Sequence, residues 1–271
     1  DGFGNAFAGK YDSVFCVNQG TPTERYKQFE AAVKSIYAST MSQDALVYRK
    51  QRGLAQKEEP MSLLIQRISG TYRGPYFFPD AAGVGVSYNT YVWSRDMKQE
   101  AGMLRMVMGL GTRAVDRVVQ DYARIVALDA PLKKTHQNMA EAKKYSQREI
   151  DVVHVAQNSF ETIPLTKLSE LGLTDLLDRF AVRDREAEKW YKDTGRPVKP
   201  SWVLTFDPLL SKGEFSALMH KILKTLEKAY NYPVDVEFTV NYTPQGNPLI
   251  NIVQCRPLQT KSKAQVVSPM P

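Results

Sequence analysis

Residues 234–240 read VDVEFTV, and residues 249–255 read LINIVQC. In the first run, apolar Val and Phe alternate strictly with Asp, Glu and Thr, and this period of two predicts a β-strand with one apolar and one polar face. A turn-rich stretch separates the two runs and contains Pro244, Gly246, Asn247 and Pro248. We therefore predict a closing β-hairpin over residues 234–256 with a long loop.

The polar face of this predicted hairpin carries residue types that bind nucleotide phosphates. Asp235 and Glu237 share one face of the first strand, and Gln254 and Arg256 share a face of the second. If that face lines a cleft, Glu237 and the Gln254 amide oxygen offer the hard oxygen ligands that Mg²⁺ prefers. The planar guanidinium of Arg256 suits phosphate oxygens. The pattern alone leaves open the alternative of a hairpin with one solvated polar face.

Helical periodicity outlines four helices elsewhere in the chain. Thr21, Pro22 and Glu24 form a capping box with proline at the first helical position, so a helix should begin there and run through Tyr37. Further helices are predicted at residues 42–48, 165–180 and 212–230.

Short apolar runs predict strands at residues 13–18, 61–68, 83–88, 104–108, 122–128 and 151–156. In contrast, residues 132–150 are polar and basic, so we expect an exposed excursion there. Because strands and helices do not alternate in a βαβ rhythm, the pattern favours an α+β fold over a doubly wound sheet.

The composition is that of an ordinary globular protein. Of the 271 residues, 43% are hydrophobic and 24% charged, which excludes a disordered tail and a coiled coil. We find neither a membrane-spanning apolar run nor a signal peptide, and the two cysteines form no CxxC motif, so a cytoplasmic protein without a membrane partner is expected. The three histidines lack metal-ligand spacing, and the net charge of +7 favours anionic partners.

Two further stretches could contact anions. The opening GNAFAGK, at residues 4–10, is rich in small residues, so the backbone near Gly9 and Lys10 could approach phosphates, although the spacing is not that of a P-loop. The stretch GLGTRAVDR, at residues 109–117, follows an apolar run and places Arg113 and Arg117 one helical turn apart. A plain turn and solvated arginines are the alternatives for these two stretches.

Five blocks, taken in order, resemble the ATP-binding, ATP-grasp domain of the phosphoenolpyruvate synthase and pyruvate phosphate dikinase family. They are GNAFAGKYDSVF, LLIQRISG, GVGVSYN, MGLGTRAVDR and the terminal VDVEFTVN…INIVQCRPLQT. The resemblance implies an ATP-grasp-like domain of mixed, largely antiparallel sheets packed with helices, whose first lobe is incomplete. Residues 1–60 would be the remainder of that lobe, 61–260 the second lobe with the basic excursion, and 261–271 a linker or tail.

The resemblance also implies roles for individual residues. Glu237 and Gln254 match the positions that hold Mg²⁺ and the phosphates, Arg256 matches the phosphate-binding arginine, and Asp235 matches the preceding acid. The loop at Gly9 and Lys10 would cover the triphosphate of ATP. Residues Gln66, Arg67 and Ile68 match the hinge whose backbone binds adenine.

The implied activity is phosphoryl transfer from Mg-ATP to a histidine on a separate swivelling domain, and onward to pyruvate on a barrel domain. Neither domain fits within 271 residues, so we expect the chain to be part of a larger enzyme and to be inactive alone. A dikinase that uses inorganic phosphate, or a relative acting on another small molecule, is a near variant.

One departure from the family keeps a second function open. The family usually carries Glu after Gly-Leu-Gly, where this chain has Thr112, so a nucleotide sensor or inactive relative that binds ATP without transfer is the alternative. The net charge of +7 is also typical of nucleic-acid-binding modules, but the aromatic residues do not interleave with the basic run as they do in RNA-binding patterns. We therefore expect no nucleic-acid partner.

Overall fold

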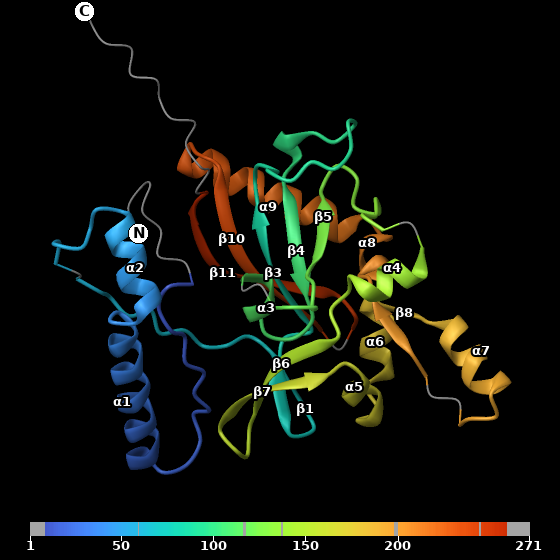
Figure 1. The fold of residues 1–271 in the computed structure, drawn as a ribbon, viewed down its shortest axis with the longest axis horizontal. Helices are drawn as coiled ribbons and strands as arrows, with labels where there is room; N and C mark the ends of the chain where they lie inside the picture. The colour runs from blue at the N-terminus through green and yellow to red at the C-terminus, as the bar shows by residue number, and fades with distance from the viewer. Residues whose placement is uncertain are drawn as a thin grey trace, which may run out of the picture.

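A central five-stranded antiparallel sheet organises the computed structural model (Figure 1). Its strand order is β11 (Pro248–Pro257), β10 (Val234–Tyr242), β3 (Ala81–Val86), β4 (Met103–Val107) and β5 (Arg124–Ala127). The predicted hairpin is therefore confirmed and lies at one edge of this sheet. The structure describes residues 9–58, 60–115, 118–136, 138–197, 200–243 and 245–258.

Two smaller sheets complete the β-structure. One is antiparallel, with the order β1 (Thr71–Arg73), β2 (Tyr76–Phe78), β6 (Glu149–His154) and β7 (Ser159–Pro164). The other pairs β8 (Ala181–Arg183) with β9 (Trp202–Leu204). A parallel bridge joins Gly109, which follows β4, to Asp151 of β6, and the Leu110 N–H donates a hydrogen bond of 2.9 Å to the Asp151 carbonyl.

Helix α9 (Glu214–Tyr230) covers the apolar face of the central sheet. Phe215, Met219 and Leu223 of this helix are buried in one core with the alternating apolar residues of β10, which are Val234, Val236, Phe238 and Val240. The short helix α3 (Thr112–Val115) packs against β3 and β4 on the other face, where Ala114 contacts Ala82 and Val107. The polar residues of β10 share that second face.

The two N-terminal helices stand to one side of the central sheet (Figure 1). They are α1 (Pro22–Ser39) and α2 (Gln43–Gln51). The predicted capping box is present, because the Glu24 N–H donates to the Thr21 hydroxyl while the Glu24 carboxylate accepts from the Thr21 N–H.

The short helix η1 (Gln99–Ala101) lies between β3 and β4 in the sequence. The remaining described helices are in the second half of the chain and are α4 (Met139–Lys144), α5 (Thr166–Glu170), α6 (Thr174–Phe180), α7 (Arg185–Asp193) and α8 (Asp207–Leu210). Among the described helices, none is both long and apolar enough to cross a bilayer. The expectation of an α+β, ATP-grasp-like fold with largely antiparallel sheets is confirmed.

Several predicted elements differ from the structure. Residues 61–68 do not form a buried strand, because they pair with none of the strands that the structure describes, and Leu64 and Ile65 are 69% and 70% exposed. Residues 13–18 likewise form no strand. The helix predicted at residues 165–180 is two short helices, because Gly172 adopts a positive φ of 73° and ends the first of them.

The basic excursion is more ordered than expected. Residues 132–150 contain α4 and the start of β6, and Ala142 and Gln147 are buried. Lys134 and Lys143 form ion pairs with Asp207 and Asp184, at 2.7 and 2.9 Å. More than half of the described residues in this segment are exposed, as predicted, but the segment also contains buried residues, and several of its lysines pair with acids elsewhere in the protein.

Candidate functional site

The closing hairpin brings its four polar candidates together in two facing pairs. Asp235 lies opposite Arg256, and Glu237 lies opposite Gln254. Residues directly opposite one another in an antiparallel pair share a face, so all four side chains project from the same side of the sheet. That face is opposite the one that α9 covers.

The Arg256 guanidinium is held at the base of this face by Asp235. Its Nε and one terminal nitrogen both donate to Asp235 Oδ2, at 3.1 Å each, and Glu237 Oε1 lies 3.8 Å away. Arg256 and Asp235 are each 17% exposed, and Glu237 is 30% exposed. The three groups are therefore neither fully buried nor spread into bulk solvent.

The charge on this face is incompletely balanced. Asp235 Oδ1 is buried and has no hydrogen-bond partner. Burial raises the pKa of Glu237, the Arg256 charge lowers it, and Asp235 adds to the increase. Because the carboxylate of Glu237 lacks full compensation, an added cation would be favoured next to it.

A β-bulge next to Glu237 connects the hairpin to the predicted hinge segment. The register shifts between Glu237 and Phe238, which leaves Val253 as the extra residue on β11. The Val253 carbonyl accepts a 2.8 Å hydrogen bond from Gln66 Nε2. Bulges often re-aim side chains beside functional sites, and this one fixes Gln66 next to the residue that precedes Gln254.

Ser69 adds a second connection between the hinge segment and the hairpin. Its hydroxyl oxygen accepts from the side-chain amides of Asn241 and Asn251, at 2.7 and 2.9 Å. Of the other predicted hinge residues, Arg67 is exposed and Ile68 half-buried. The structure therefore places the predicted adenine-binding segment beside the predicted metal-binding strands.

Arg105 is a candidate that the sequence reasoning missed. Glu237 pairs with Val84 on β3, and Val84 pairs with Arg105 on β4, so Arg105 shares the face of Glu237 two strands away, roughly 10 Å across the sheet. An arginine inside the apolar run Met103-Leu104-Arg105-Met106-Val107 was the signal that could have revealed it. This residue adds a second cation to the polar face.

Gly9 and Lys10 lie near α2. Gly9 has a positive φ of 66°, as a tight turn requires, and Lys10 Nζ lies 5.6 Å from the ring centroid of Tyr48. Among the described residues, no hydrogen bond or ion pair joins Lys10 to the hairpin. Its contact with the triphosphate therefore stays a prediction. The residues preceding Gly9 in this loop, and Arg117, lie outside the described part of the chain.

Arg113 is the predicted site residue that the structure disfavours. Its guanidinium is 7% exposed and binds Asp151 at 2.9 Å, Glu149 at 3.0 Å, and Asp121. Burial opposes the charged form, but the carboxylates of Asp151 and Asp121 outweigh it, so the pKa of Arg113 is raised. Because carboxylates of the protein already occupy its donors, a structural role fits Arg113 better than contact with a nucleotide.

Thr112, the residue that follows Gly-Leu-Gly, belongs to the same cluster. Its hydroxyl donates to Asp151 Oδ2 at 2.7 Å, and Thr162 donates to Asp151 Oδ1 at 2.7 Å. The Thr112 hydroxyl therefore fixes the Gly-Leu-Gly turn to β6.

The oxygen donors of the hairpin fit a hard cation that is shared with a phosphate ligand. Within the described residues, no group of three or more His, Cys, Asp or Glu side chains is arranged to hold a metal by itself. Mg²⁺ in nucleotide sites commonly takes one or two protein oxygens and completes its shell with phosphate and water. Glu237 and Gln254, which face each other across the hairpin, meet that requirement.

Comparison with known protein families gives a match that covers almost the whole chain. The family model described as "Pyruvate phosphate dikinase, AMP/ATP-binding domain" matches residues 1–270. No curated protein matches the chain.

Proposed function

Because the chain belongs to the pyruvate phosphate dikinase AMP/ATP-binding domain family, we propose that it binds Mg-ATP over the polar face of the closing hairpin. In the full-length protein it would then donate a phosphoryl group to a histidine on a separate domain, and from there to pyruvate. The observation that supports this most strongly is the register that pairs Asp235 with Arg256 and Glu237 with Gln254 on one half-buried face.

Each residue of the hairpin has a distinct task in this proposal. Arg256 donates to phosphate oxygens and stabilises the negative charge that grows as the phosphoryl group leaves. Asp235 holds the Arg256 guanidinium in place through Nε and one terminal nitrogen, which leaves other N–H groups for the ligand. Glu237 and Gln254 would hold Mg²⁺, whose chemistry is to neutralise charge on the phosphates.

The hinge segment supplies the base-binding part of the site. The backbone of residues 66–68 would bind adenine, and Gln66 and Ser69 fix this segment to β10 and β11. The Leu64 and Ile65 side chains are exposed next to it and could provide apolar walls for the base.

The test is single-turnover transfer from phosphate-labelled ATP to a supplied histidine domain, with the full-length protein as donor. Glu237→Ala and Arg256→Ala should each lower the rate about 100-fold or more, because each removes charge stabilisation from the transferring group. Arg95→Ala is the matched control, since Arg95 is exposed. Transfer at the normal rate in both hairpin variants would reject this site.

Nucleotide binding without transfer is the second candidate. It is favoured by Thr112, whose hydroxyl is engaged with Asp151 where relatives carry an acid. The same assay separates the two functions. Saturable ATP binding by the unaltered full-length protein, with no label reaching the histidine domain, would establish the sensor and exclude the transferase.

A further inference from the structure

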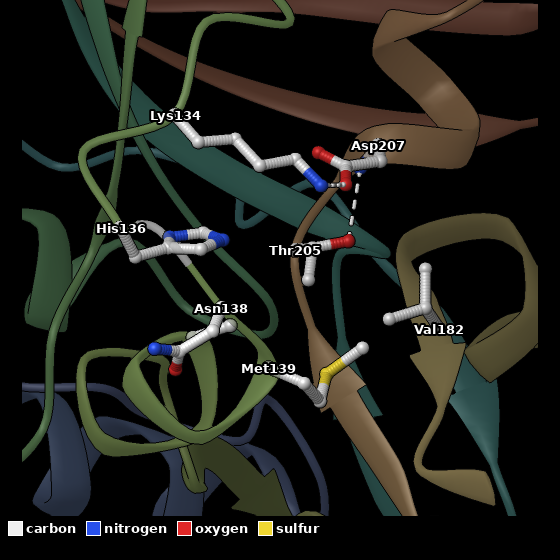
Figure 2. A pocket seen from close by; sticks show the side chains of 8 residues that line it. Lys134, His136, Asn138, Met139, Val182, Thr205 and Asp207 are labelled. Atoms are coloured by element: carbon white, nitrogen blue, oxygen red, sulfur yellow. Dashed lines mark hydrogen bonds and ion pairs between the residues drawn. The ribbon is translucent and has the colours of Figure 1, made fainter.

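A cavity of about 300 Å³ lies away from the hairpin, between the basic segment 132–150 and the elements β8, β9 and α8 (Figure 2). Its lining residues come from those two parts of the chain and are Lys134, His136, Asn138, Met139, Ala142, Val182, Thr205 and Asp207. None of them belongs to the proposed nucleotide site.

The cavity has a polar end and a mainly apolar end. In Figure 2, Lys134 reaches Asp207, with Nζ 2.7 Å from Oδ2, and His136 lies below Lys134. Met139 lies at the lower end with Asn138 beside it, and Val182 lies to the right, beyond Thr205. Convergent polar groups on one side of an apolar-walled cavity are typical of sites for small molecules.

Arg124 contributes a second, buried cation beside Asp207. Its side chain is 7% exposed, and its terminal nitrogen is 3.8 Å from Asp207 Oδ1, too far for a hydrogen bond. Arg124 Nε, that terminal nitrogen and Asp207 Oδ1 are all buried without a hydrogen-bond partner. Burial lowers the pKa of Arg124, and Asp207 offsets only part of this effect. Leaving buried donors without an acceptor costs stability, so an acceptor close to this cation would be favourable.

Two cations, Arg124 and Lys134, flank the one carboxylate of Asp207, so these three side chains carry a surplus of one positive charge. Burial, followed by the charges of Arg124 and Lys134, lowers the pKa of His136, while the carboxylates of Asp207 and Glu141 oppose this change. One additional negative charge beside Lys134 would balance the group of three.

The backbone that presents Asp207 is strained. Phe206 lies between Thr205 and Asp207 and has a positive φ of 58°, which is rare for a bulky residue. Phe206 is 1% exposed and its ring packs on Phe180, so the core maintains this conformation. Strain of this kind is retained where surrounding structure requires it, and it is frequent at ligand sites.

We propose that this cavity binds a small organic monoanion, with its carboxylate at Lys134, close to the buried charge of Arg124 behind the lining, and its short apolar part against Met139, Ala142 and Val182. The inference does not depend on the proposed nucleotide function, and nothing in the hairpin takes part in it. A monocarboxylate matches the surplus of one charge, and its hydrocarbon part matches the apolar end.

The test uses the ring resonances of the histidines in NMR spectra. The chain has three histidines, so His154 and His220 are internal controls for His136. Titration with n-butyrate should shift His136 alone, saturably and with a dissociation constant of about 1 mM, and neutral butyramide should not. Acetate should bind roughly tenfold more weakly, because it lacks two methylene groups for the apolar end.

Two neighbouring lysines provide matched variants. Lys134→Met should abolish the butyrate-dependent shift, whereas Lys133→Met, which makes the same change in charge, should retain it because Lys133 pairs with Asp96 instead. Arg256→Ala should also retain it, which separates this result from any failure of the nucleotide site. Equal shifts with butyramide, a shift that survives Lys134→Met, or no saturable shift up to about 100 mM would overturn the proposal.

Discussion

Two arginines in this domain lie among carboxylates, and the difference between their surroundings separates a structural cluster from a candidate ligand site. Arg113 is bonded to Asp151, Asp121 and Glu149, and no buried nitrogen of its guanidinium lacks a partner. Arg256 makes both of its hydrogen bonds to one oxygen of Asp235, whose other oxygen is buried and unpaired. The first arginine is satisfied by the protein, and the second retains capacity for a ligand.

The largest expected effect is on stability at the satisfied cluster. Arg113→Met should lower the free energy of unfolding by about 3–5 kcal/mol, because it leaves the buried carboxylates of Asp151 and Asp121 without their cation. Urea denaturation would measure it, with exposed Arg95→Met as a control expected to stay within about 0.5 kcal/mol. If Arg113→Met were as stable as the control, the cluster would not be structural.

Replacing the hairpin arginine by methionine should affect ATP binding strongly and stability only slightly. Arg256→Met should weaken ATP binding roughly 30- to 100-fold, the loss expected for charge-assisted hydrogen bonds, while changing stability by about 1 kcal/mol. Isothermal titration calorimetry and urea denaturation of the full-length protein give the two numbers. If Arg256→Met were strongly destabilised but bound ATP with unchanged affinity, the contrast between the two arginines would be lost.

A smaller effect is expected at Thr112. Thr112→Val removes the hydroxyl that donates to Asp151, and should cost about 1.5 kcal/mol of stability without changing ATP affinity. Thr112→Ser keeps the hydroxyl and should restore most of that stability. Loss of ATP binding in a stable Thr112→Val protein would instead place this threonine in the nucleotide site.

The smallest effect concerns the pH dependence of stability. Because burial raises the pKa of Glu237, the folded protein holds this proton more tightly than the unfolded chain. The stability that this tighter proton binding contributes is fully present below the pKa of Glu237 in the unfolded chain. It is lost as the pH rises through the pKa of Glu237 in the folded protein.

Glu237→Gln removes this titration, so its melting temperature relative to the unaltered protein should increase between about pH 4 and pH 8. The expected change is below about 1 kcal/mol. A difference in melting temperature that stays constant over this pH range would contradict the conclusion that burial raises the pKa of Glu237.

The hairpin was predictable because its information is local. Strict alternation in residues 234–240 specifies which side chains share a face, and the structure confirms that arrangement. The capping box at Thr21 is local in the same sense. The pair at β1 and β2 could also have been found from Gly74-Pro75 between two β-prone runs, a signal that the prediction overlooked.

The differences between the prediction and the structure came from properties that depend on distant residues. The apolar run 61–68 has the composition of a strand. A strand also needs a neighbouring strand to pair with, and the sequence alone does not reveal whether one is present. Arg113 looks like an anion site, but the acids that neutralise it come from other parts of the chain. Arg105 became a candidate only through the pairing of three strands.

The position of β11 has a consequence for how the protein behaves in concentrated solution. Among the described strands, β11 ends the central sheet, and Leu249 and Ile252 on it are exposed. Apart from Val253, whose carbonyl accepts a hydrogen bond from Gln66, an edge strand of this kind can add a strand from another molecule. The net charge of +7 opposes such association by electrostatic repulsion, which salt screens. The solubility of this domain should therefore fall as ionic strength rises, unless a bound partner covers that edge.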